Sequence, residues 1–406
     1  MHLRWESHFR RRPMPRRSSF QRRTISVFVV CSCFLCIAFG QKAKDRTTAG
    51  PQTRLYYVAA DEVEWDYAPG GADPMTGKPF EGMAKAYTES GPHRIGKVYR
   101  KAIYREYTDG TFGVLKSRPA GTEYLGSLGP ILRGVVGDTI RVVFRNNGTH
   151  PFSMHPHGVF YLKNSEGAPY NDGTSGVDKL DDAVPPGGTF TYVWPVLERS
   201  GPGPNDPGSL VWLYHSHTNE LHDVESGLIG AIIVTARGKA RPDGTPLDVD
   251  REFVNLFMAY DENQSWYLSY NIEHFTTDPK GVNKIETVSM DVDSAASLVG
   301  TGFSDVNLRY SINGFMFGTM PMMMMQKGER VRWYLLTVGE GLNFHTPHWH
   351  GNTVLLNGSR TDVVALSPAQ MVTVDMVPDN PGIWMYHCHV SEHMEIGMMA
   401  HYHVMP

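Results

Sequence analysis

Short runs in which apolar and polar residues alternate recur along most of the chain. Residues 139–145 and 371–377 are clear examples, and Gly, Pro and Asn residues bound many of these runs. Because successive side chains of a strand point to opposite faces, such alternation predicts strands with one buried face. No long stretch has the apolar spacing of a helix. The pattern therefore predicts an all-β protein built of antiparallel β-sandwiches or barrels.

The chain contains two similar segments that carry the same motifs in the same order. The first has GDTIRV at 137–142, HPHG at 155–158 and VWLYHSH at 211–217, and the second has GERVRW at 328–333, HWHG at 348–351 and IWMYHCH at 383–389. This repetition indicates an internal duplication. The length of 406 residues also suits two domains. We expect them at residues 50–240 and 250–406, with the joint near 237–250, where Gly, Pro and charged residues cluster.

The first 40 residues have the composition of a secretory signal peptide. Arginines crowd residues 4–23, and an apolar run follows at 25–40, ending in small residues. The run is too short for a membrane span, although an uncleaved anchor is the alternative. Arg22 and Arg23 loosely resemble a twin-arginine signal. We expect export to the periplasm or the extracellular space, with no membrane segment in the mature chain.

Charge and cysteine content narrow the chemistry. The formal net charge of −4 argues against nucleic acid as a partner. Three of the four cysteines lie within the first 40 residues, so the mature chain keeps only Cys388. A lone cysteine in an exported protein is a buried bystander, an intermolecular link or a chemical centre. The residues around Cys388 favour the last of these.

Ten of the 18 histidines fall in four short clusters. These are His155 and His157; His215 and His217; His345, His348 and His350; and His387, His389 and His393. Side chains two residues apart share one face of a strand, so each His-x-His pair can bind one metal site. Four pairs supply eight imidazoles, which suits a multi-copper cluster and exceeds what one zinc ion needs.

Cys388 lies between His387 and His389 and therefore points to the opposite face of its strand. His345 has the parity to meet it there, and His393 and Met398 follow it by five and ten residues. Two histidines, one cysteine thiolate and an axial methionine are the ligands of a blue (type 1) copper, which transfers single electrons. An electron arriving at Cys388 is one residue from the ligands of the other cluster.

The first segment lacks this second kind of site. Ser216 stands at the position of Cys388, and Phe152 stands at that of His345. We therefore expect one electron-accepting site in each chain, in its second domain.

The chain resembles a multicopper oxidase, and in particular a third of ceruloplasmin or hephaestin. The resemblance covers roughly residues 54–405. It rests on YY at 56–57, WDY at 65–67, GPI at 129–131, EGA at 166–168, DEN at 261–263, WYL at 266–268 and SING at 311–314. It implies two tandem cupredoxin domains of the Greek-key β-sandwich or barrel type. It also implies that electrons taken at the type 1 copper reduce dioxygen to water at a trinuclear type 2/type 3 copper cluster held by the eight paired histidines.

In ceruloplasmin that cluster lies between the first and last of six domains. A two-domain chain would then share its clusters with neighbouring subunits. The resemblance thus implies a homotrimer with three such clusters, similar to the small two-domain laccases.

The resemblance also assigns roles to several acidic residues. Asp172 matches a carboxylate that relays protons beside the cluster, or else serves the turn of residues 171–173. Four residues match a calcium site, although a solvated acidic loop explains them equally well: Lys163 through its carbonyl, Asp178, Asp181 and Asp182.

The reductant is left open between Fe(II), Cu(I) and a phenol. Glu392 and Asp305 match acids of the iron-oxidising site, but Tyr310 replaces the histidine of that site, which argues against efficient iron oxidation. The methionines near residues 320–325 suit Cu(I), although packing in a buried strand is the simpler explanation.

Two other functions are alternatives. A copper nitrite reductase would carry its blue copper in the first domain, which Ser216 and the full set of eight paired histidines disfavour. A non-catalytic copper-binding protein would be expected to lose ligands, and none is missing.

Overall fold

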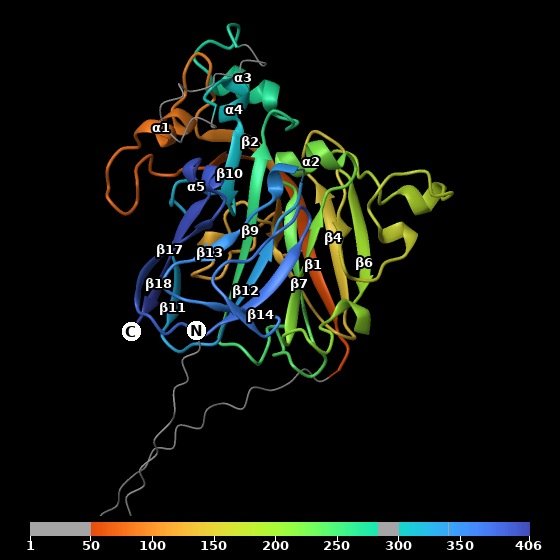
Figure 1. Cartoon of the computed structure of the whole chain (residues 1–406). Helices are drawn as coiled ribbons and strands as arrows, with labels where there is room; N and C mark the ends of the chain where they lie inside the picture. The colour runs from red at the N-terminus through yellow and green to blue at the C-terminus, as the bar shows by residue number, and fades with distance from the viewer. Residues whose placement is uncertain (1–49, 283–299, 340) are drawn as a thin grey trace, which may run out of the picture. The chain divides into compact units, whose positions relative to one another are not determined.

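The computed structural model describes residues 50–282, 300–339 and 341–406 (Figure 1). The expected signal peptide at residues 1–40 lies outside the described residues. Within the described part, no helix is both long enough and apolar enough to cross a membrane.

The first half of the described chain forms two four-stranded sheets. One has the order β2-β1-β4-β6, with bounds Val98–Tyr107, Thr53–Asp66, Thr139–Asn146 and Thr189–Pro195. The other has the order β3-β8-β7-β5, with bounds Ile131–Val135, Ile229–Thr235, Ser209–His215 and His155–Pro156. In β4, Ile140, Val142 and Phe144 are buried while Arg141 is exposed, so the alternation in sequence becomes one core-facing side of the strand.

The second half repeats this arrangement. One sheet has the order β10-β9-β12-β16-β14-β15, with bounds Leu308–Ile312, Arg251–Asp261, Val331–Leu336, Met371–Met376, Val354–Leu356 and Ser359–Thr361. The other has the order β11-β18-β17-β13, with bounds Met323–Gln326, Met399–Met405, Gly382–Cys388 and Pro347–Trp349. Apart from the added β14–β15 hairpin, the two halves have the same strand order, as an internal duplication requires.

The all-β prediction is confirmed, but the expected wholly antiparallel pairing is wrong in one respect. Each sheet contains one parallel pair: β1 with β4, β3 with β8, β9 with β12, and β11 with β18. Parallel neighbours need a long crossover, and these crossovers carry the chain from one sheet to the other. Alternation along a strand does not reveal the direction of its neighbour, so the sequence pattern could not distinguish the two cases. The domain boundaries at 50–240 and 250–406 stay a prediction.

Helices are short and lie in the connections. The α-helices are α1 (Gly82–Thr88), α2 (Glu220–Ser226), α3 (Leu268–Phe275), α4 (Phe303–Val306) and α5 (Ser391–Glu395). The 3₁₀ turns are η1 (Glu123–Leu125), η2 (Lys163–Ser165), η3 (Gly176–Lys179), η4 (Glu198–Ser200) and η5 (Gly341–Asn343). Two of the helices, α2 and α5, directly follow the strands β7 and β17 that carry histidine pairs, so both fix loops beside candidate metal ligands.

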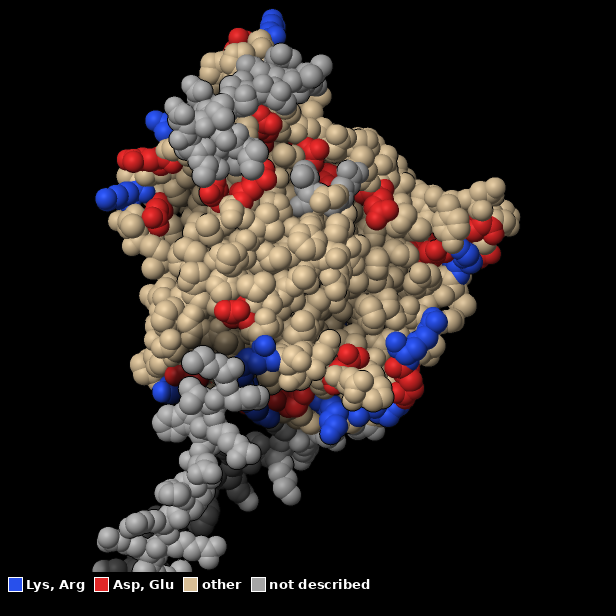
Figure 2. All heavy atoms as spheres, in the orientation of Figure 1, with Lys and Arg blue, Asp and Glu red and all other residues tan. Residues whose placement is uncertain are grey.

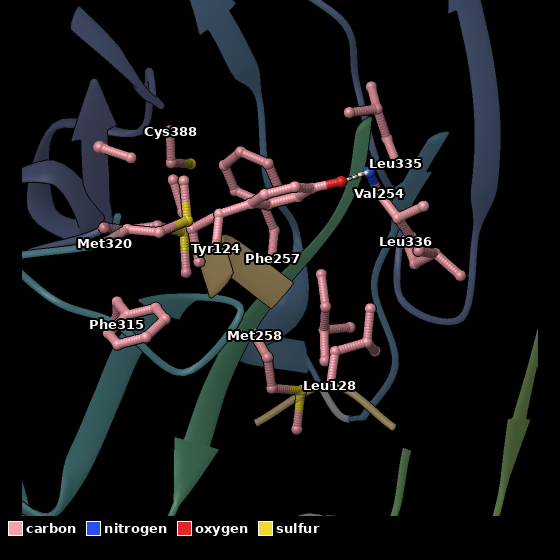
Figure 3. Packing of buried hydrophobic residues seen from close by; sticks show 14 of the residues in the cluster. Tyr124, Leu128, Val254, Phe257, Met258, Phe315, Met320, Leu335, Leu336 and Cys388 are labelled. Carbon is pink, nitrogen blue, oxygen red and sulfur yellow. Dashed lines mark hydrogen bonds between the residues drawn. The ribbon is translucent and has the colours of Figure 1, made fainter. Parts of the chain in front are cut away.

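A buried apolar cluster joins the two halves. Figure 3 shows Tyr124 and Leu128, from the first half, packed among second-half residues that include Phe257. The hydroxyl of Tyr124 accepts a hydrogen bond of 3.3 Å from the backbone N–H of Val254 on β9. Cys388 belongs to the same cluster and is fully buried. The lone cysteine of the mature chain therefore lies in a core to which both halves contribute.

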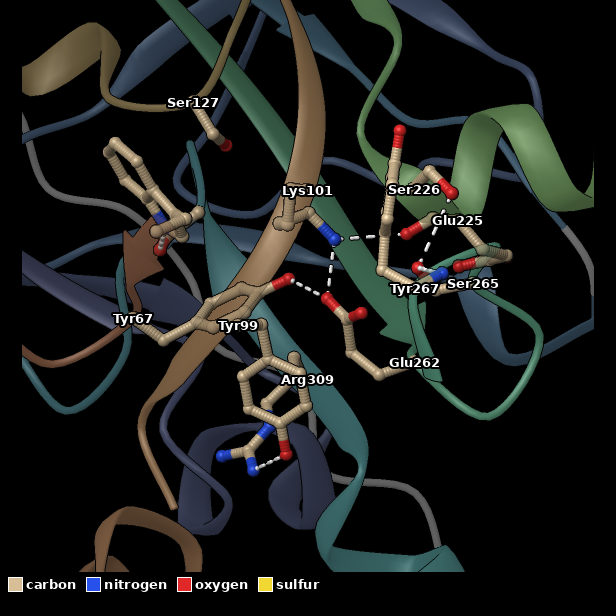
Figure 4. A network of polar contacts seen from close by, with 12 residues as sticks. Tyr67, Tyr99, Lys101, Ser127, Glu225, Ser226, Glu262, Ser265, Tyr267 and Arg309 are labelled. Atoms are coloured by element: carbon tan, nitrogen blue, oxygen red, sulfur yellow. Dashed lines mark hydrogen bonds and ion pairs between the residues drawn. The ribbon is translucent and has the colours of Figure 1, made fainter. Parts of the chain in front are cut away.

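A buried polar network also crosses between the halves (Figure 4). The ammonium group of Lys101 on β2 pairs with the carboxylate of Glu262, which follows β9, and both side chains are fully buried. Tyr67 donates a 2.6 Å hydrogen bond to the same carboxylate, and Lys101 also donates to the backbone carbonyl of Glu225 on α2. These added hydrogen bonds offset the free-energy cost of removing the two charged groups from water. The network therefore holds β2 of the first half against the end of β9 of the second half.

Candidate metal centres

The first histidine cluster lies where β5 meets β7. These strands pair with His155 opposite His215, and the ligand atoms of His155, His157 and His215 lie within 4.8 Å of one another. The Nε2 atoms of His157 and His215 are 3.2 Å apart. The ring of His217 lies 5.2 Å from that of His155. We call these four histidines half-site 1. Because a metal–imidazole bond is ~2.0 Å long, nitrogens this close can bind the same ion.

The second cluster repeats this geometry at β13 and β17. His348 pairs opposite His387, and the ligand atoms of His348, His350 and His387 lie within 4.8 Å of one another. The Nε2 atoms of His350 and His387 are 3.0 Å apart, and the ring of His389 lies 5.1 Å from that of His348. We call these four histidines half-site 2. His350 and His389 are exposed, so half-site 2 opens onto the surface of the single chain.

Backbone carbonyls orient several of these imidazoles. The Nδ1 atoms of His155, His215, His348 and His387 lie 2.7 to 3.0 Å from the carbonyl oxygens of Glu166, Ser216, Asp362 and Cys388, respectively. A carbonyl oxygen only accepts, so in these contacts Nδ1 is the protonated nitrogen and Nε2 is left free for a metal. Burial also lowers the pKa of His157 to about 4. Burial likewise lowers the pKa of His155, His215 and His387, which favours the neutral imidazole that metal ions require.

The predicted blue-copper ligands meet on the other face of β17. The ligand atoms of His345, Cys388 and His393 lie within 4.8 Å of one another, with Cys388 Sγ 3.9 Å from Nδ1 of His345 and 3.6 Å from Nδ1 of His393. Met398 is buried beside them. Its N–H donates to the carbonyl of His393, and its own carbonyl accepts from the N–H of Cys388. The loop from Cys388 to Met398 therefore returns to the site, as its length predicts. We call these four residues the blue site.

The protonation of the blue site suits a metal that displaces the thiol proton. Burial lowers the pKa of His345 to about 3 and that of His393 to about 4, which keeps both imidazoles neutral. Burial raises the pKa of the Cys388 thiol, although the Thr346 N–H, 3.3 Å from Sγ, opposes this rise. Two neutral imidazoles and a buried thiol beside a methionine are the donor set that copper binds in electron-transfer proteins. The fold and this site thus define a protein of the blue-copper class.

The equivalent place in the first half is filled by non-ligands. Ser216 donates a 2.6 Å hydrogen bond to Asp223 and accepts one from the Ser153 N–H. Phe152, which stands at the position equivalent to His345, is fully buried. Trp266 donates to the other oxygen of Asp223. Asp223 could not be singled out in the sequence, because it lies on α2, where the two halves differ in length. The structure thus places no blue-type ligand set in the described residues of the first half.

Among the described residues, the hydrogen bonds and ion pairs of Asp172 are with its own loop and with none of the clustered histidines. Its carboxylate accepts two hydrogen bonds from Thr174 and pairs with the ammonium groups of Lys163 and Lys179. These contacts, with Thr174 the largest, hold the pKa of Asp172 well below its usual range. Lys163 also pairs with Glu166, whose carbonyl orients His155. Asp172 is therefore tied to half-site 1 through the loop, and its proton-relay role stays a prediction.

The expected calcium loop is held together by lysine in this structure. Lys179 pairs with Asp182 as well as with Asp172, and one oxygen of the buried Asp181 accepts from the Gly167 N–H. The other Asp181 oxygen has no hydrogen-bond partner among the described residues. Lys163 and Asp178 lie in η2 and η3 of the same loop. A calcium ion here would compete with an ammonium group for Asp182, so calcium stays a prediction.

The methionine run packs as a strand. In β11, Met323 and Met325 are buried in the core while Met324 is partly exposed, and Met320 is buried as well. Alternate burial of this kind is what an edge strand over a core produces. The geometry favours packing over a Cu(I) site.

Several residues near the sites were missed at the level of sequence. The carboxylate of Glu220 lies 3.3 Å from Nε2 of His217, and the side chain of Asn343 lies 3.1 Å from Nε2 of His345. Glu220 follows His215 by five residues, just as Glu392 follows His387. Comparison of the two repeats could therefore have predicted that Glu220 lies near the histidines, whereas no sequence pattern indicated Asn343.

Glu392 and Asp305 lie in short helices that adjoin segments of the blue site. Glu392 directly precedes His393 in α5, and Asp305 lies in α4, which leads into β10, and accepts a hydrogen bond from the Gly302 N–H. Burial raises the pKa of Tyr87 most, and the charges of Asp305 and Glu392 add smaller contributions. The ring of Tyr310 lies against that of His393, with centroids 4.6 Å apart. The sequence predicted Tyr310 only as a replaced ligand and did not reveal this contact.

Comparisons with known proteins agree with the fold and the sites. Residues 125–239 and 282–406 match two families described as Multicopper oxidase. The human protein named Ferroxidase HEPHL1 is 46% identical over 358 residues, which are 87% of this chain and 29% of that protein. Human Hephaestin is 40% identical over 356 residues, covering 87% and 29% of the two chains, and rat Ceruloplasmin is 37% identical over 356 residues, covering 88% and 32%. The chain thus spans about a third of the length of the curated relatives it matches.

Solved structures share the fold at low sequence identity. One described as multicopper oxidase mgLAC superposes with a TM-score of 0.53 at 18% identity, covering 87% of this chain and 86% of that one. The blue copper oxidase from Nitrosomonas europaea gives a TM-score of 0.51 at 18% identity, with the same coverage.

The chain belongs to the multicopper oxidases, and its two β-halves are cupredoxin-type domains. Copper is accordingly the metal that the family and the His/Cys clusters imply.

Proposed function

We propose that the chain takes single electrons from a small reductant at the blue site and uses them to reduce dioxygen to water at the paired histidines. Copper bound at these sites would supply a one-electron acceptor and a centre for the four-electron step. The observation that carries the proposal is the alternation along the end of β17. His387 points into half-site 2 and Cys388 into the blue site, so adjacent residues connect the two.

The two alternative functions lack support of this kind. A nitrite reductase of two such domains would need a blue site in the first half, where Ser216 and Phe152 stand instead. A non-catalytic copper protein would not require all ten histidines of the clusters, and each of them lies in one of the three sites. We also propose that the protein is exported, on the composition of residues 1–40.

We further propose that each cluster forms between two chains of a homotrimer. Half-sites 1 and 2 form separate ligand groups in the described chain, and each leaves histidines open to solvent. Leu162, just before η2, and Leu197, between β6 and η4, are exposed apolar residues. The middle of the face in Figure 2 carries few charged side chains. Depletion of charge and exposed apolar residues are properties of the buried part of a subunit interface.

Complementation between two inactive variants tests the shared cluster. One variant carries His155→Ala and His157→Ala, and the other carries His348→Ala and His350→Ala. Each alone is inactive, but co-expressed chains regain about a quarter of wild-type oxygen consumption, because one interface in four joins two intact half-sites in a randomly mixed ring. Sedimentation of the same samples gives three times the mass of the chain. Full activity in a sedimenting monomer, or no recovery in the mixture, would contradict the proposal.

Fe(II) is the reductant that we propose, even though Tyr310 replaces the histidine of the iron-oxidising site that the resemblance implies. Glu392 directly precedes His393 in α5, and Asp305 lies in α4, which leads into β10 and Tyr310. Carboxylate oxygens of this kind suit a divalent metal cation. Acidic side chains gather at the end of the molecule where α1, α4 and α5 lie (Figure 2). One relative is named Ferroxidase HEPHL1. Cu(I) and phenols are the alternatives, and the buried methionines of β11 do not favour Cu(I).

Oxygen consumption with Fe(II) and with a simple phenol, measured side by side on copper-loaded protein, tests this choice. Glu392→Gln combined with Asp305→Asn is expected to raise the KM for Fe(II) by about tenfold or more, since the loss of a charged partner costs ~1.5–3 kcal/mol. The KM for the phenol stays unchanged. Glu395→Gln, an exposed change on the same helix α5, is the matched control and leaves both values as they are. Faster phenol oxidation by the wild-type protein would make it laccase-like.

A further inference from the structure

Tyr310 covers one side of the blue site. It lies in the middle of β10, where its neighbours Arg309 and Ser311 point to the opposite face. The rings of Tyr310 and His393 have centroids 4.6 Å apart and planes tilted by 42°. Tyr310 is only 2% exposed and His393 only 7% exposed. The imidazole is therefore almost closed off from solvent, and Tyr310 is part of the wall that closes it.

The orientation of His393 decides which of its edges is closed. Its Nδ1 atom lies 3.6 Å from Cys388 Sγ and 3.2 Å from Nδ1 of His345, so this edge faces the metal position. The remainder of the ring, including Nε2, is turned away from the metal position. A reductant in solution would make contact with this outer edge of the ring. Because His393 is only 7% exposed, the outer edge is covered.

Acidic residues lie near the tyrosine ring and closer to the surface. Asp261 of β9 pairs opposite Leu308 of β10, two residues from Tyr310, and Glu392 directly precedes His393 in α5. Both acidic residues are less buried than Tyr310 and His393. Burial, and after it the charges of Glu392 and Asp261, raise the pKa of Tyr310. The two rings are therefore more deeply buried than the carboxylates around them.

We propose that Tyr310 is a specificity-determining residue of the blue site. Its ring prevents a reductant from touching His393, so the reductant binds at the carboxylates outside the ring. The class of reductant that suits this arrangement is a small metal cation, because an aromatic molecule would need contact with the imidazole edge. This inference rests on the proposed function, and it assigns to Tyr310 the selection of the reductant. With copper bound by the blue site, each Fe(II) would lose one electron to it and leave as Fe(III), while Tyr310 would provide packed contact and remain chemically unchanged.

Chemical modification of the copper-free full-length chain tests the covering role without any measurement of activity. Diethyl pyrocarbonate modifies accessible imidazoles, and mass spectrometry gives the rate at each histidine. His393 is expected to react at least tenfold more slowly than the exposed His274 in the wild-type protein and in Tyr310→Phe, which keeps the ring. Tyr310→Ala is expected to raise the rate at His393 about tenfold or more.

Controls keep this test decisive. His345, whose Nδ1 atom lies 3.2 Å from that of His393, is fully buried and stays unreactive in every variant that folds. If Tyr310→Ala makes His345 reactive, Tyr310→Val replaces it as the opening variant. Equal reactivity of His393 and His274 in the wild-type protein, or no increase at His393 in a folded opening variant, overturns the proposal.

Steady-state kinetics of the copper-loaded variants then test specificity. Tyr310→Ala is expected to raise kcat/KM for a phenol at least tenfold and to leave the KM for Fe(II) within about twofold, with the blue absorption retained. Unchanged phenol oxidation beside a newly reactive His393 overturns the role in specificity. Failure of the wild-type protein to oxidise Fe(II) would instead overturn the proposed reductant, and the modification rates distinguish the two failures.

Discussion

Replacing Cys388 by Ser removes the blue colour of the copper-loaded protein and lowers its oxygen consumption by more than about 100-fold. Loss of a residue that only orients a metal ligand costs ~10- to 100-fold, and Cys388 is expected to be a ligand itself. The side chain is also the link between the blue site and half-site 2, because His387 and His389 are its neighbours in β17. Visible absorption and an oxygen electrode measure the two effects.

Two controls accompany this variant. Far-ultraviolet circular dichroism is expected to be unchanged, since Ser is smaller than Cys and fits the same buried position. Ser216→Ala changes the equivalent residue of the first half, which loses its hydrogen bond to Asp223 but keeps the blue absorption. Retained blue colour or turnover in Cys388→Ser would refute the assigned ligand.

Replacing Lys101 by Met lowers the free energy of unfolding by about 3–5 kcal/mol, which is the usual cost of leaving one partner of a buried ion pair. Glu262 would keep its hydrogen bond from Tyr67 but lose the only ammonium group that pairs with it among the described residues. Urea unfolding followed by tryptophan fluorescence measures the change.

The matched control for this change is Lys116→Met. The ammonium group of Lys116 pairs with Glu106, but its side chain is 53% exposed, so the expected loss is below about 1 kcal/mol. The double variant Lys101→Met with Glu262→Leu removes both buried charges and is expected to regain part of the lost stability. Equal losses in Lys101→Met and Lys116→Met would show that the buried pair has no special role.

The sequence predicted which histidines and cysteine lie together because side chains two residues apart share a face of a strand. This rule puts His387 and His389 on one face and Cys388 on the other. The pairing of β13 with β17, which the sequence pattern does not give, brings His348 opposite His387. That these residues bind copper stays a prediction. The same rule predicted one blue site in the second half.

What the sequence did not reveal depends on contacts between distant segments. Tyr310 and His393 lie on different elements, β10 and α5, and only the packing of the second domain brings their rings together. Lys101 and Glu262 come from different halves of the chain. The two lysines on Asp172 likewise depend on how one loop folds back on itself. Local patterns contain no information about such pairs.

The alternation at the end of β17 also constrains how this gene can change. Insertion or deletion of one residue in the strand before His387 would turn every later side chain to the other face, placing the histidines in the core and the cysteine at the surface. Both copper sites would then be lost together. The amino acid at an exposed position of the strand, such as Ile383, can change, whereas the number of residues in the strand cannot. Cys388 and the histidines on either side of it are therefore inherited as one unit.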